Sequence, residues 1–368
     1  MEKRYDCVIV GGSITGLTAA RELSKKASVL LVESNPKIGT PFRCSGFINA
    51  PAFEEFALAK AQIQNSISQL EVVHGSSSLT FASKKPSGFV TERPALERSL
   101  LGEVEPYIDI ITGDKVIDIK SGTVSMHASG NVSAGCLIGA DGTNSLVRRS
   151  IGIADPEKVT AVQFELPGRF ERDRAAIYVG EEFMPFHLWV IPVNESLARI
   201  GIGTAGDVRA GMQRLLELVK KYRIADYSKY KEARFMVNTL PSSPVSSTGK
   251  GSTMLAGMSG SIIKPLSLGG IYFGMLSASM AARSLIDGTL APGYERKLET
   301  AGILARVYDE FALLKRWSSL TDAKLCNAFS RAEAESGREI PMPSGGAQQT
   351  SGITGIIKFL IVNSAVGG

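Results

Sequence analysis

The first 33 residues constrain the fold of this chain more than any other segment. Residues 5–10 form an apolar run that predicts a short strand, and residues 13–25 carry apolar side chains at helical spacing. A second apolar run, residues 28–32, predicts another strand. A strand, a helix and a strand in this order favour an α/β fold built on a parallel sheet.

The turn between the first strand and the helix has the chemistry of a dinucleotide-binding turn. It fits the pattern GxGxxG except that Ser13 replaces the second glycine. An acid, Glu33, ends the second strand about 20 residues later, where it can bind ribose hydroxyls. The alternative is a β-α-β unit without a cofactor. We expect the cofactor contacts of this segment at Gly11, Ser13, Ile14, Thr15, Gly16 and Glu33.

Composition argues against a disordered chain, a nucleic-acid-binding protein and a fold held by metal or disulfides. Of the 368 residues, 44% are apolar and 21% are charged, so the chain can form a sizeable core. The net charge of +5 is not gathered into a lysine-arginine tract with aromatic residues, so no nucleic-acid partner is expected. The cysteines are far apart and form no CxxC pair, which predicts neither a metal site nor a disulfide framework.

Contact with a membrane is expected to be peripheral at most. No segment has the roughly 20 apolar residues that cross a bilayer, and we expect no signal peptide. The apolar segment 355–363 predicts a terminal helix docked on the core, with a helix on a membrane surface as the alternative. We expect a cytoplasmic protein, with a peripheral position on the inner face of the cell membrane as a further alternative.

The pattern of elements predicts an α/β fold in which two domains interleave along the chain. Residues 51–70 are predicted to be helical, and residues 158–205 alternate like an antiparallel sheet. We expect a Rossmann-like domain, a substrate-binding sheet domain and a helical C-terminal region. Their predicted ranges are 1–50, 86–157 and 246–290 for the first, 51–85 and 158–245 for the second, and 291–368 for the third.

Two further segments carry a family resemblance. Residues 136–149 predict a strand, an Asp141-Gly142 turn and a helix, which resembles the second signature of the aromatic-hydroxylase-like FAD superfamily. The resemblance implies that this turn supports FAD binding. Arg93 resembles the flavin-contacting arginine of that superfamily, with an ordinary surface residue as the alternative.

The third segment, residues 255–271, is similar to the superfamily's glycine-rich turn before a helix under the flavin. Met258 occupies the position of the usual aspartate, which normally holds the ribityl chain. The positions that match the pattern are Gly257, Pro265, Gly269, Gly270 and Ile271.

Within this superfamily the chain resembles the geranylgeranyl reductases. Their substrate-domain motif is matched by Trp189, Pro192 and the two glycines of Gly201-Ile202-Gly203, while His187 stands where tyrosine is usual. The loop 41–46 resembles that family's cysteine-containing loop near the flavin. A flavin-dependent halogenase or monooxygenase acting on an aromatic substrate is the alternative, because halogenases share the Trp-x-Ile-Pro ending. A non-catalytic flavin- or lipid-binding protein is a third hypothesis.

The resemblance implies an FAD-dependent reductase that saturates carbon–carbon double bonds of geranylgeranyl chains, with an isoprenoid membrane ether lipid as the expected substrate. NAD(P)H or a ferredoxin-type protein would act as a transient reductant. We expect Cys44, His187 and Trp189 at the reacting bond, with Arg43 and Cys44 beside the cofactor. An apolar tunnel is predicted from residues that could equally form sheet core: Phe183, Met184, Phe186, Leu188 and Trp189.

Overall fold

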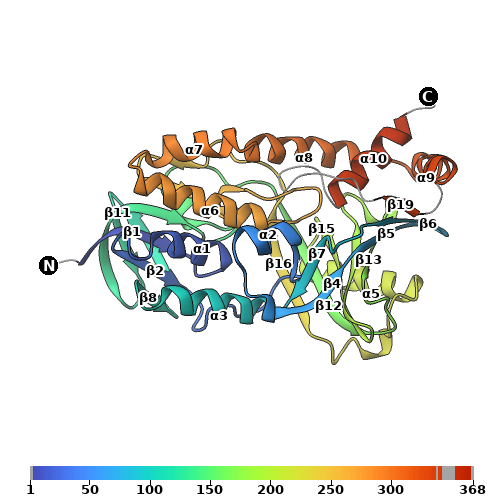
Figure 1. The fold of residues 1–368 in the computed structure, drawn as a ribbon, viewed down its shortest axis with the longest axis horizontal. Coiled ribbons are helices and arrows are strands. Elements are labelled where there is room, and N and C mark those ends of the chain that lie inside the picture. The colour runs from blue at the N-terminus through green and yellow to red at the C-terminus, as the bar shows by residue number, and fades with distance from the viewer. Residues whose placement is uncertain (1–2, 337–338, 342–352, 366–368) are drawn as a thin grey trace. The chain divides into compact units, whose positions relative to one another are not determined.

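The chain folds into two compact units whose segments alternate along the sequence (Figure 1). The structure is a computed structural model that describes residues 3–336, 339–341 and 353–365. The first unit comprises Met1–Phe42, Arg93–Lys158 and Leu240–Asp309, and the second comprises Arg43–Glu92, Val159–Thr239 and Glu310–Gly368. The C-terminal region expected at 291–368 is therefore divided between the two units.

The first unit is built on an eight-stranded sheet with a parallel centre. In spatial order its main path is β17 (Gly249–Lys250), β18 (Thr253–Leu255), β11 (Gly130–Gly139), β1 (Lys3–Val10), β2 (Val29–Glu33) and β8 (Asp109–Thr112). All neighbours on this path are parallel except β17 and β18. An antiparallel extension is formed by β10 (Thr123–Met126) and β9 (Val116–Lys120). Strand β1 is a continuous buried run from residue 7 to residue 10, as expected for a parallel strand covered on both faces.

Helices of the first unit pack closely because small residues line their contacts. Helix α1 buries its glycine and alanine residues, and its main helical neighbours are α6 and α3. The helical segments are α1 (Ile14–Leu23), α3 (Arg93–Val104), α4 (Leu146–Ser150), η4 (Gly257–Gly260), α6 (Ile271–Ile286) and α7 (Leu290–Thr300). Helix α8 (Ile303–Trp317) continues from this unit into the second.

The second unit contains a mostly antiparallel eight-stranded sheet and a small three-stranded sheet. The large sheet has the order β16 (Phe235–Pro241), β12 (Lys158–Pro167), β15 (Leu197–Thr204), β14 (Leu188–Asn194), β13 (Arg174–Tyr178), β5 (Gln69–His74), β6 (Ser77–Ala82) and β19 (Glu339–Pro341). The small sheet consists of β3 (Phe47–Asn49), β7 (Gly88–Thr91) and β4 (Ile63–Ile67). The prediction of a helix over residues 51–70 is therefore wrong beyond its first turns, because β4 pairs with β7.

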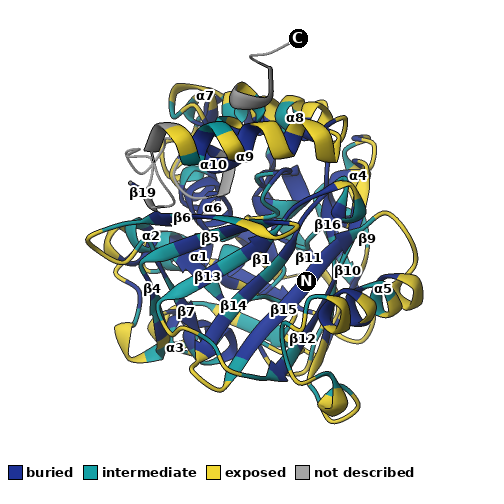
Figure 2. Cartoon of the chain, turned by 90° about the vertical axis from the view of Figure 1, so that its right-hand side faces the viewer, coloured by how far each residue is buried: buried dark blue, intermediate teal, exposed yellow. Residues whose placement is uncertain are grey.

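Helices cover the second unit with amphipathic faces. Helix α5 has one exposed and one buried side (Figure 2), and the buried side packs in a cluster with β12, β14 and β15. The apolar C-terminal helix packs against α9. The helical segments are α2 (Ala50–Glu55), η1 (Lys60–Gln62), η2 (Glu181–Phe183), α5 (Val208–Lys221), η3 (Tyr227–Lys229), α9 (Asp322–Ser336) and α10 (Ile353–Ala365).

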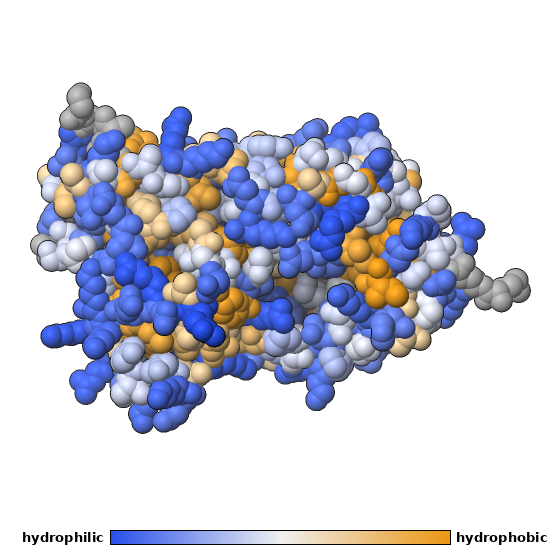
Figure 3. All heavy atoms as spheres, turned by 180° about the vertical axis from the view of Figure 1, so that it is seen from behind, coloured by the Kyte–Doolittle hydropathy of each residue, from blue (hydrophilic) through white to orange (hydrophobic). Residues whose placement is uncertain are grey.

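The fold class predicted from the sequence is confirmed: a Rossmann-like parallel sheet, a separate antiparallel sheet and C-terminal helices. No helix in the described ranges is long and apolar enough to cross a membrane. The face in Figure 3 intersperses hydrophilic side chains with smaller apolar areas. Large exposed apolar side chains come from different segments of the chain: Tyr107, Ile117, Val208, Phe235, Ile286, Tyr308 and Val362.

Candidate functional site

The glycine turn after β1 has no room for side chains at its two key positions. Gly11 has φ +106°, and a Cβ built on it would lie 2.3 Å from the Ala140 carbonyl oxygen. A Cβ on Gly16 would lie 1.9 Å from the Gly11 carbonyl oxygen. The Ser13 side chain does not cap helix α1. The turn therefore brings backbone against the helix N-terminus, as a bound pyrophosphate requires.

Glu33 lies at the carboxyl end of β2, beside this turn. Its Oε2 accepts a hydrogen bond from the Gly12 amide at 2.7 Å. Its Oε1 accepts from the amide and the side chain of Asn35, at 2.7 and 2.6 Å. The carboxylate is thus held at the edge where parallel α/β sheets bind ligands, and its position fits a ribose acceptor.

Arg93 and Glu97 form a buried pair at the N-terminus of α1. The Glu97 carboxylate accepts from the Ile14 amide at 3.0 Å and from the Arg93 guanidinium. Arg93 is only 8% exposed, so the surface alternative for this residue is wrong. Since the Ile14 amide already has a partner, a cofactor phosphate would use other donors of the first helical turn.

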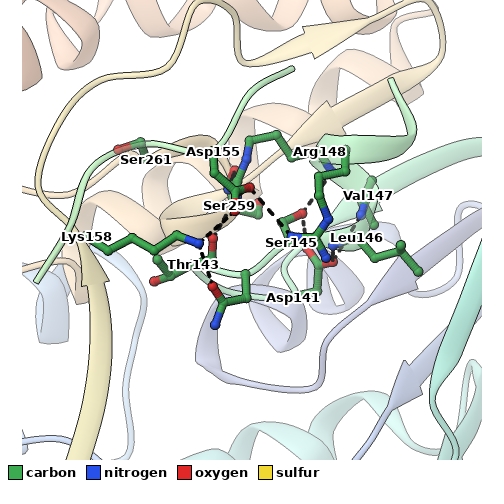
Figure 4. Close-up of polar contacts among 12 residues, drawn as sticks. Asp141, Thr143, Ser145, Leu146, Val147, Arg148, Asp155, Lys158, Ser259 and Ser261 are labelled. Carbon is green, nitrogen blue, oxygen red and sulfur yellow. Dashed lines mark hydrogen bonds and ion pairs between the residues drawn. The ribbon is translucent and has the colours of Figure 1, made fainter. Parts of the chain in front are cut away.

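The Asp141-Gly142 turn is joined to the helix that follows it (Figure 4). One Asp141 oxygen accepts from the amides of Leu146 and Val147 at 2.7 and 3.1 Å, and the other accepts from the Ser145 hydroxyl at 2.6 Å. Burial raises the pKa of Asp141, against the effect of these donors. Gly142 supplies the positive φ of +77° that the turn needs. The turn is therefore rigid, and its predicted contact with FAD stays a prediction.

Arg148 ties this turn to the segment that carries Met258 (Figure 4). Its fully buried guanidinium donates to the carbonyls of Ser259 and Thr143 at 2.9 and 2.8 Å, and pairs with Asp155. The Thr143 hydroxyl lies 3.8 Å from the Met258 sulfur. A single buried cation thus fixes two of the segments that resemble FAD-binding motifs.

The glycine-rich segment before α6 packs on the dinucleotide turn. Gly257 has φ +61°, and a Cβ on it would lie 3.1 Å from the Thr15 hydroxyl oxygen. Gly269 lies in a short β-bridge, Gly270 is the N-terminal cap of α6, and Ile271 begins the helix. The three segments identified from the sequence therefore meet in the first unit, and their backbone cradle fits a dinucleotide.

In the second unit, a buried glutamine joins two of the predicted catalytic residues. The Trp189 indole N–H donates to Gln163 Oε1 at 2.8 Å. The Gln163 amide nitrogen lies 3.5 Å from the Cys44 carbonyl oxygen. Trp189 is paired with Gly201 across β14 and β15, and a Cβ on Gly201 would lie 2.3 Å from the indole ring. The first glycine of the motif is therefore required by the tryptophan ring.

The loop around Cys44 is fixed by a buried arginine on β15. Arg199 donates to the carbonyls of Ser45 and Thr91 at 2.8 and 3.1 Å, and to the Glu165 carboxylate at 2.9 Å. Its side chain is 1% exposed. Gly46 has φ +74°, and a Cβ on it would lie 2.3 Å from the guanidinium. The Arg199 guanidinium thus joins the Ser45 carbonyl of the loop to the Thr91 carbonyl at the end of β7.

The two side chains at the start of this loop differ in exposure. Arg43 is exposed, which leaves it accessible to an anionic group. Cys44 is half-buried, and its sulfur lies 3.3 Å from the Gly46 amide nitrogen. Their predicted contacts with a cofactor stay predictions.

His187 does not have the character of a proton relay. It is 1% exposed, and neither ring nitrogen has a hydrogen-bond partner among the described residues. Burial lowers its pKa to about 4. This side chain therefore does not titrate near neutrality, because an imidazolium without a partner is costly in an apolar setting. Its ring lies 6.3 Å from the Trp189 ring, centroid to centroid, so we assign it a packing role.

Replacing His187 with leucine is expected to stabilise the protein in mild acid. The unfolded imidazole takes up a proton below its usual pKa of 6.5, whereas the folded one does so only near 4. Native stability therefore falls as the pH drops from 6.5 to 4, by about 3 kcal/mol in all. Denaturant titrations at pH 5 and pH 7.5 should show that His187→Leu loses this pH-dependent part. The exposed His127, changed to glutamine, is the control, and an unchanged pH dependence in His187→Leu would contradict the assignment.

Glu97, Gln163 and Arg199 are among the residues of the candidate site that were not predicted from the sequence. Glu97 had a usable signal, since it lies four residues after Arg93 and such a pair meets on one side of a helix. Gln163 and Arg199 lie on strands, where only the three-dimensional pairing reveals that polar side chains are buried. Both act on the Cys44 loop.

Comparison with known proteins supports the resemblance found in the sequence. Residues 9–47 match the family of NAD(P)-binding Rossmann-like domains. Digeranylgeranylglycerophospholipid reductase 2 of Methanothermobacter thermautotrophicus is 27% identical over 322 residues, which cover 80% of this chain and 83% of that protein.

Solved structures show how widely the fold is shared. A geranylgeranyl bacteriochlorophyll reductase-like protein from Thermoplasma acidophilum has a TM-score of 0.82 at 19% identity, covering 97% of this chain and 96% of its own. A probable FAD-dependent monooxygenase from Pseudomonas aeruginosa has a TM-score of 0.66 at 17% identity, covering 86% of this chain and 97% of its own. The resemblance predicted from the sequence is confirmed: most of this chain is similar to a digeranylgeranylglycerophospholipid reductase, and its fold is that of a geranylgeranyl bacteriochlorophyll reductase-like protein.

Proposed function

We propose that this chain is an FAD-dependent reductase that saturates the carbon–carbon double bonds of geranylgeranyl chains in membrane ether lipids. One observation carries the proposal: the likeness to a digeranylgeranylglycerophospholipid reductase extends over 80% of the chain. A likeness of this extent cannot be confined to the first unit and must include segments of the second. The fold alone does not choose between a reductase and a monooxygenase, since both have it.

The residues proposed to hold FAD lie in the first unit. Gly11 and Gly16 let the turn pack closely at the N-terminus of α1, which would face the pyrophosphate, and Glu33 is placed to accept from ribose hydroxyls. When bound and reduced, FAD would supply the hydride for the double bond. NAD(P)H or a ferredoxin-type protein is proposed as the transient source of the electrons.

The second unit is proposed to hold the isoprenoid chain and to control its protonation. An isolated double bond has no carbonyl to polarise it, so one carbon must receive a proton from a donor that is held in place. Cys44 is the proposed pocket or proton-relay residue, because Arg199 and Gln163 fix its loop. Trp189 would provide a rigid apolar wall, since Gln163 satisfies its N–H. We infer that the protein meets its lipid substrate at a membrane surface.

The test is mass spectrometry of a geranylgeranyl ether lipid after anaerobic incubation with the protein, FAD and dithionite. The lipid should gain hydrogen in pairs, without oxygen. A parallel aerobic reaction with NADPH distinguishes the alternatives, because a monooxygenase adds an oxygen atom to its substrate. An unchanged lipid in both reactions, with flavin bound to the protein, would contradict the proposed function.

Replacing Met258 with aspartate is expected to strengthen FAD binding. Met258 is partly buried next to Gly257, at the position where the related superfamily has an aspartate on the ribityl chain. One hydrogen bond to a charged group contributes about 1.5 kcal/mol, so the dissociation constant should fall about tenfold. The dissociation constant is measured by titrating the apoprotein with FAD and monitoring flavin fluorescence. Met258→Leu serves as the control, and equal affinities in the two variants would contradict the proposed role.

A further inference from the structure

A second group of reactive side chains lies in the second unit, on elements that the proposed function does not use. His74 is the last residue of β5, and Asp322 begins α9, with Cys326 one turn later. Positions four apart lie on the same side of a helix, so Asp322 and Cys326 both reach the same imidazole. We call these three residues the Cys326 cluster.

The imidazole of the Cys326 cluster is held between a carboxylate and a thiol. His74 Nε2 lies 3.2 Å from Asp322 Oδ1, and His74 Nδ1 lies 3.8 Å from Cys326 Sγ, within the range of a hydrogen bond to sulfur. The ring is 8% exposed and packs against Phe329, with centroids 5.5 Å apart. Asp322 is itself fixed, because its Oδ1 accepts from the Glu181 amide at 2.9 Å. The ring therefore has one orientation.

This order of groups matches the chemistry of an activated nucleophile. The Glu181 amide, together with His74, lowers the pKa of Asp322, so its carboxylate is charged at neutral pH. A carboxylate at Nε2 favours the tautomer with its proton on that nitrogen, which leaves the Nδ1 lone pair facing the thiol. A base that is oriented by a third group and lies next to a thiol is the general arrangement for thiolate formation.

Solvent access distinguishes Cys326 from the other three cysteines. Cys326 is exposed, Cys7 and Cys136 are buried, and Cys44 is half-buried. The buried imidazole thus faces a thiol that reagents in solution can reach, and reactive cysteines are found in such partly exposed settings. In the described part of the chain, no three or more His, Cys, Asp or Glu side chains are arranged so that they could hold a metal ion. Metal binding therefore does not account for the cluster.

We propose that Cys326 is an activated thiol that hydroperoxides oxidise to a sulfenic acid. His74 Nδ1 accepts the thiol proton while sulfur attacks one oxygen of the O–O bond. The S–O bond forms and the O–O bond breaks, so sulfur loses two electrons and the peroxide gains them. The departing alkoxide or hydroxide takes the proton from His74, and the products are the sulfenic acid and an alcohol or water. This proposal does not depend on the proposed reductase activity.

The experiment measures the rate at which hydrogen peroxide oxidises Cys326 at pH 7. The full-length protein is treated with peroxide, sulfenic acid is trapped with dimedone, and the labelled cysteine is located by peptide mass spectrometry. Cys326 of the wild-type protein should react at least about tenfold faster than Cys326 of the His74→Gln variant. General-base catalysis typically contributes about a hundredfold or more, so this is a conservative expectation. Asp322→Asn should give an intermediate rate, because the tautomer loses its carboxylate partner.

Two controls keep the result interpretable. Thermal unfolding establishes that each variant is folded. Should His74→Gln fail to fold, Asp322→Asn is compared instead, since the Asp322 side chain is 56% exposed and its loss leaves the core intact. The rate for Cys326 in the urea-unfolded wild-type chain gives the reactivity without the cluster. Equal rates in the folded and unfolded wild-type chain, or in the wild type and the folded variants, would overturn the proposal.

Discussion

Replacing Gly16 with alanine is expected to abolish the retention of FAD through purification. The added Cβ would lie 1.9 Å from the Gly11 carbonyl oxygen, a backbone atom that no rotamer change can move away. Helix α1 must therefore shift from the turn, and this moves the helix N-terminus that is proposed to face the pyrophosphate. Overpacking of this kind costs about 1–3 kcal/mol or more, and misplaced phosphate donors add to it. The ratio of flavin absorbance to protein measures the result.

Gly102→Ala provides a matched control for this prediction. Gly102 is also a glycine inside a helix, α3, but a Cβ built on it has nothing within 4 Å. Alanine there should raise stability by about 0.5–1 kcal/mol and leave flavin retention unchanged, since glycine is a poor helix former. Equal flavin content in the two variants would show that the close approach at Gly16 is not required for cofactor binding.

The parts of the fold that could be predicted are those that follow from local sequence. The opening β-α-β unit was predictable because a parallel strand is a continuous apolar run, and the run ends at a glycine turn. The helix that begins at Arg93 was predictable from Pro94 in its first turn. In both cases the local preference and the final fold agree.

The helix predicted over residues 51–70 shows where local sequence is not enough. Only Ala50–Glu55 and a short 3₁₀ turn, Lys60–Gln62, are helical. Residues 63–67 form β4, since pairing with β7 satisfies their backbone groups. The partner strand lies more than 20 residues away in the sequence, and no helical or strand period in residues 51–70 reports it.

The residues of the candidate site also fall into two groups: those that local sequence predicts and those whose role depends on tertiary contacts. The sequence motif predicts glycine at position 201. Only the structure explains why: Gly201 pairs across the strands with Trp189, whose ring leaves no room for a side chain. The burial that changes His187 from a titrating side chain into a neutral one depends on residues from distant segments. The same holds for Arg199, whose partners are spread from residue 45 to residue 165. Buried polar networks of this kind need tertiary structure to be seen.

Replacing Arg199 with methionine is expected to cause the largest loss of stability in the second unit and to free the Cys44 loop. Methionine keeps much of the volume but removes the Arg199 donor from Glu165 Oε1 and from the carbonyls of Ser45 and Thr91. Removing one partner of a buried ion pair costs about 3–5 kcal/mol. Denaturant titration measures this loss. Alkylation of Cys44 by a maleimide, in a Cys326→Ser background, should become faster because the loop is no longer fixed.

Arg234→Met tests whether the loss of stability and the faster Cys44 alkylation in Arg199→Met come from the freed loop or only from the lost partner of Glu165. Arg234 lies 3.6 Å from the other Glu165 oxygen, but its side chain is 48% exposed. Water can replace such a partner, so its loss should cost at most about 1 kcal/mol and leave Cys44 alkylation unchanged. Arg199→Lys keeps the charge without the forked donors, and it should restore part of the stability but not the slow alkylation. If Arg199→Met were as stable as Arg234→Met, with unchanged alkylation, Arg199 would not be the residue that positions Cys44.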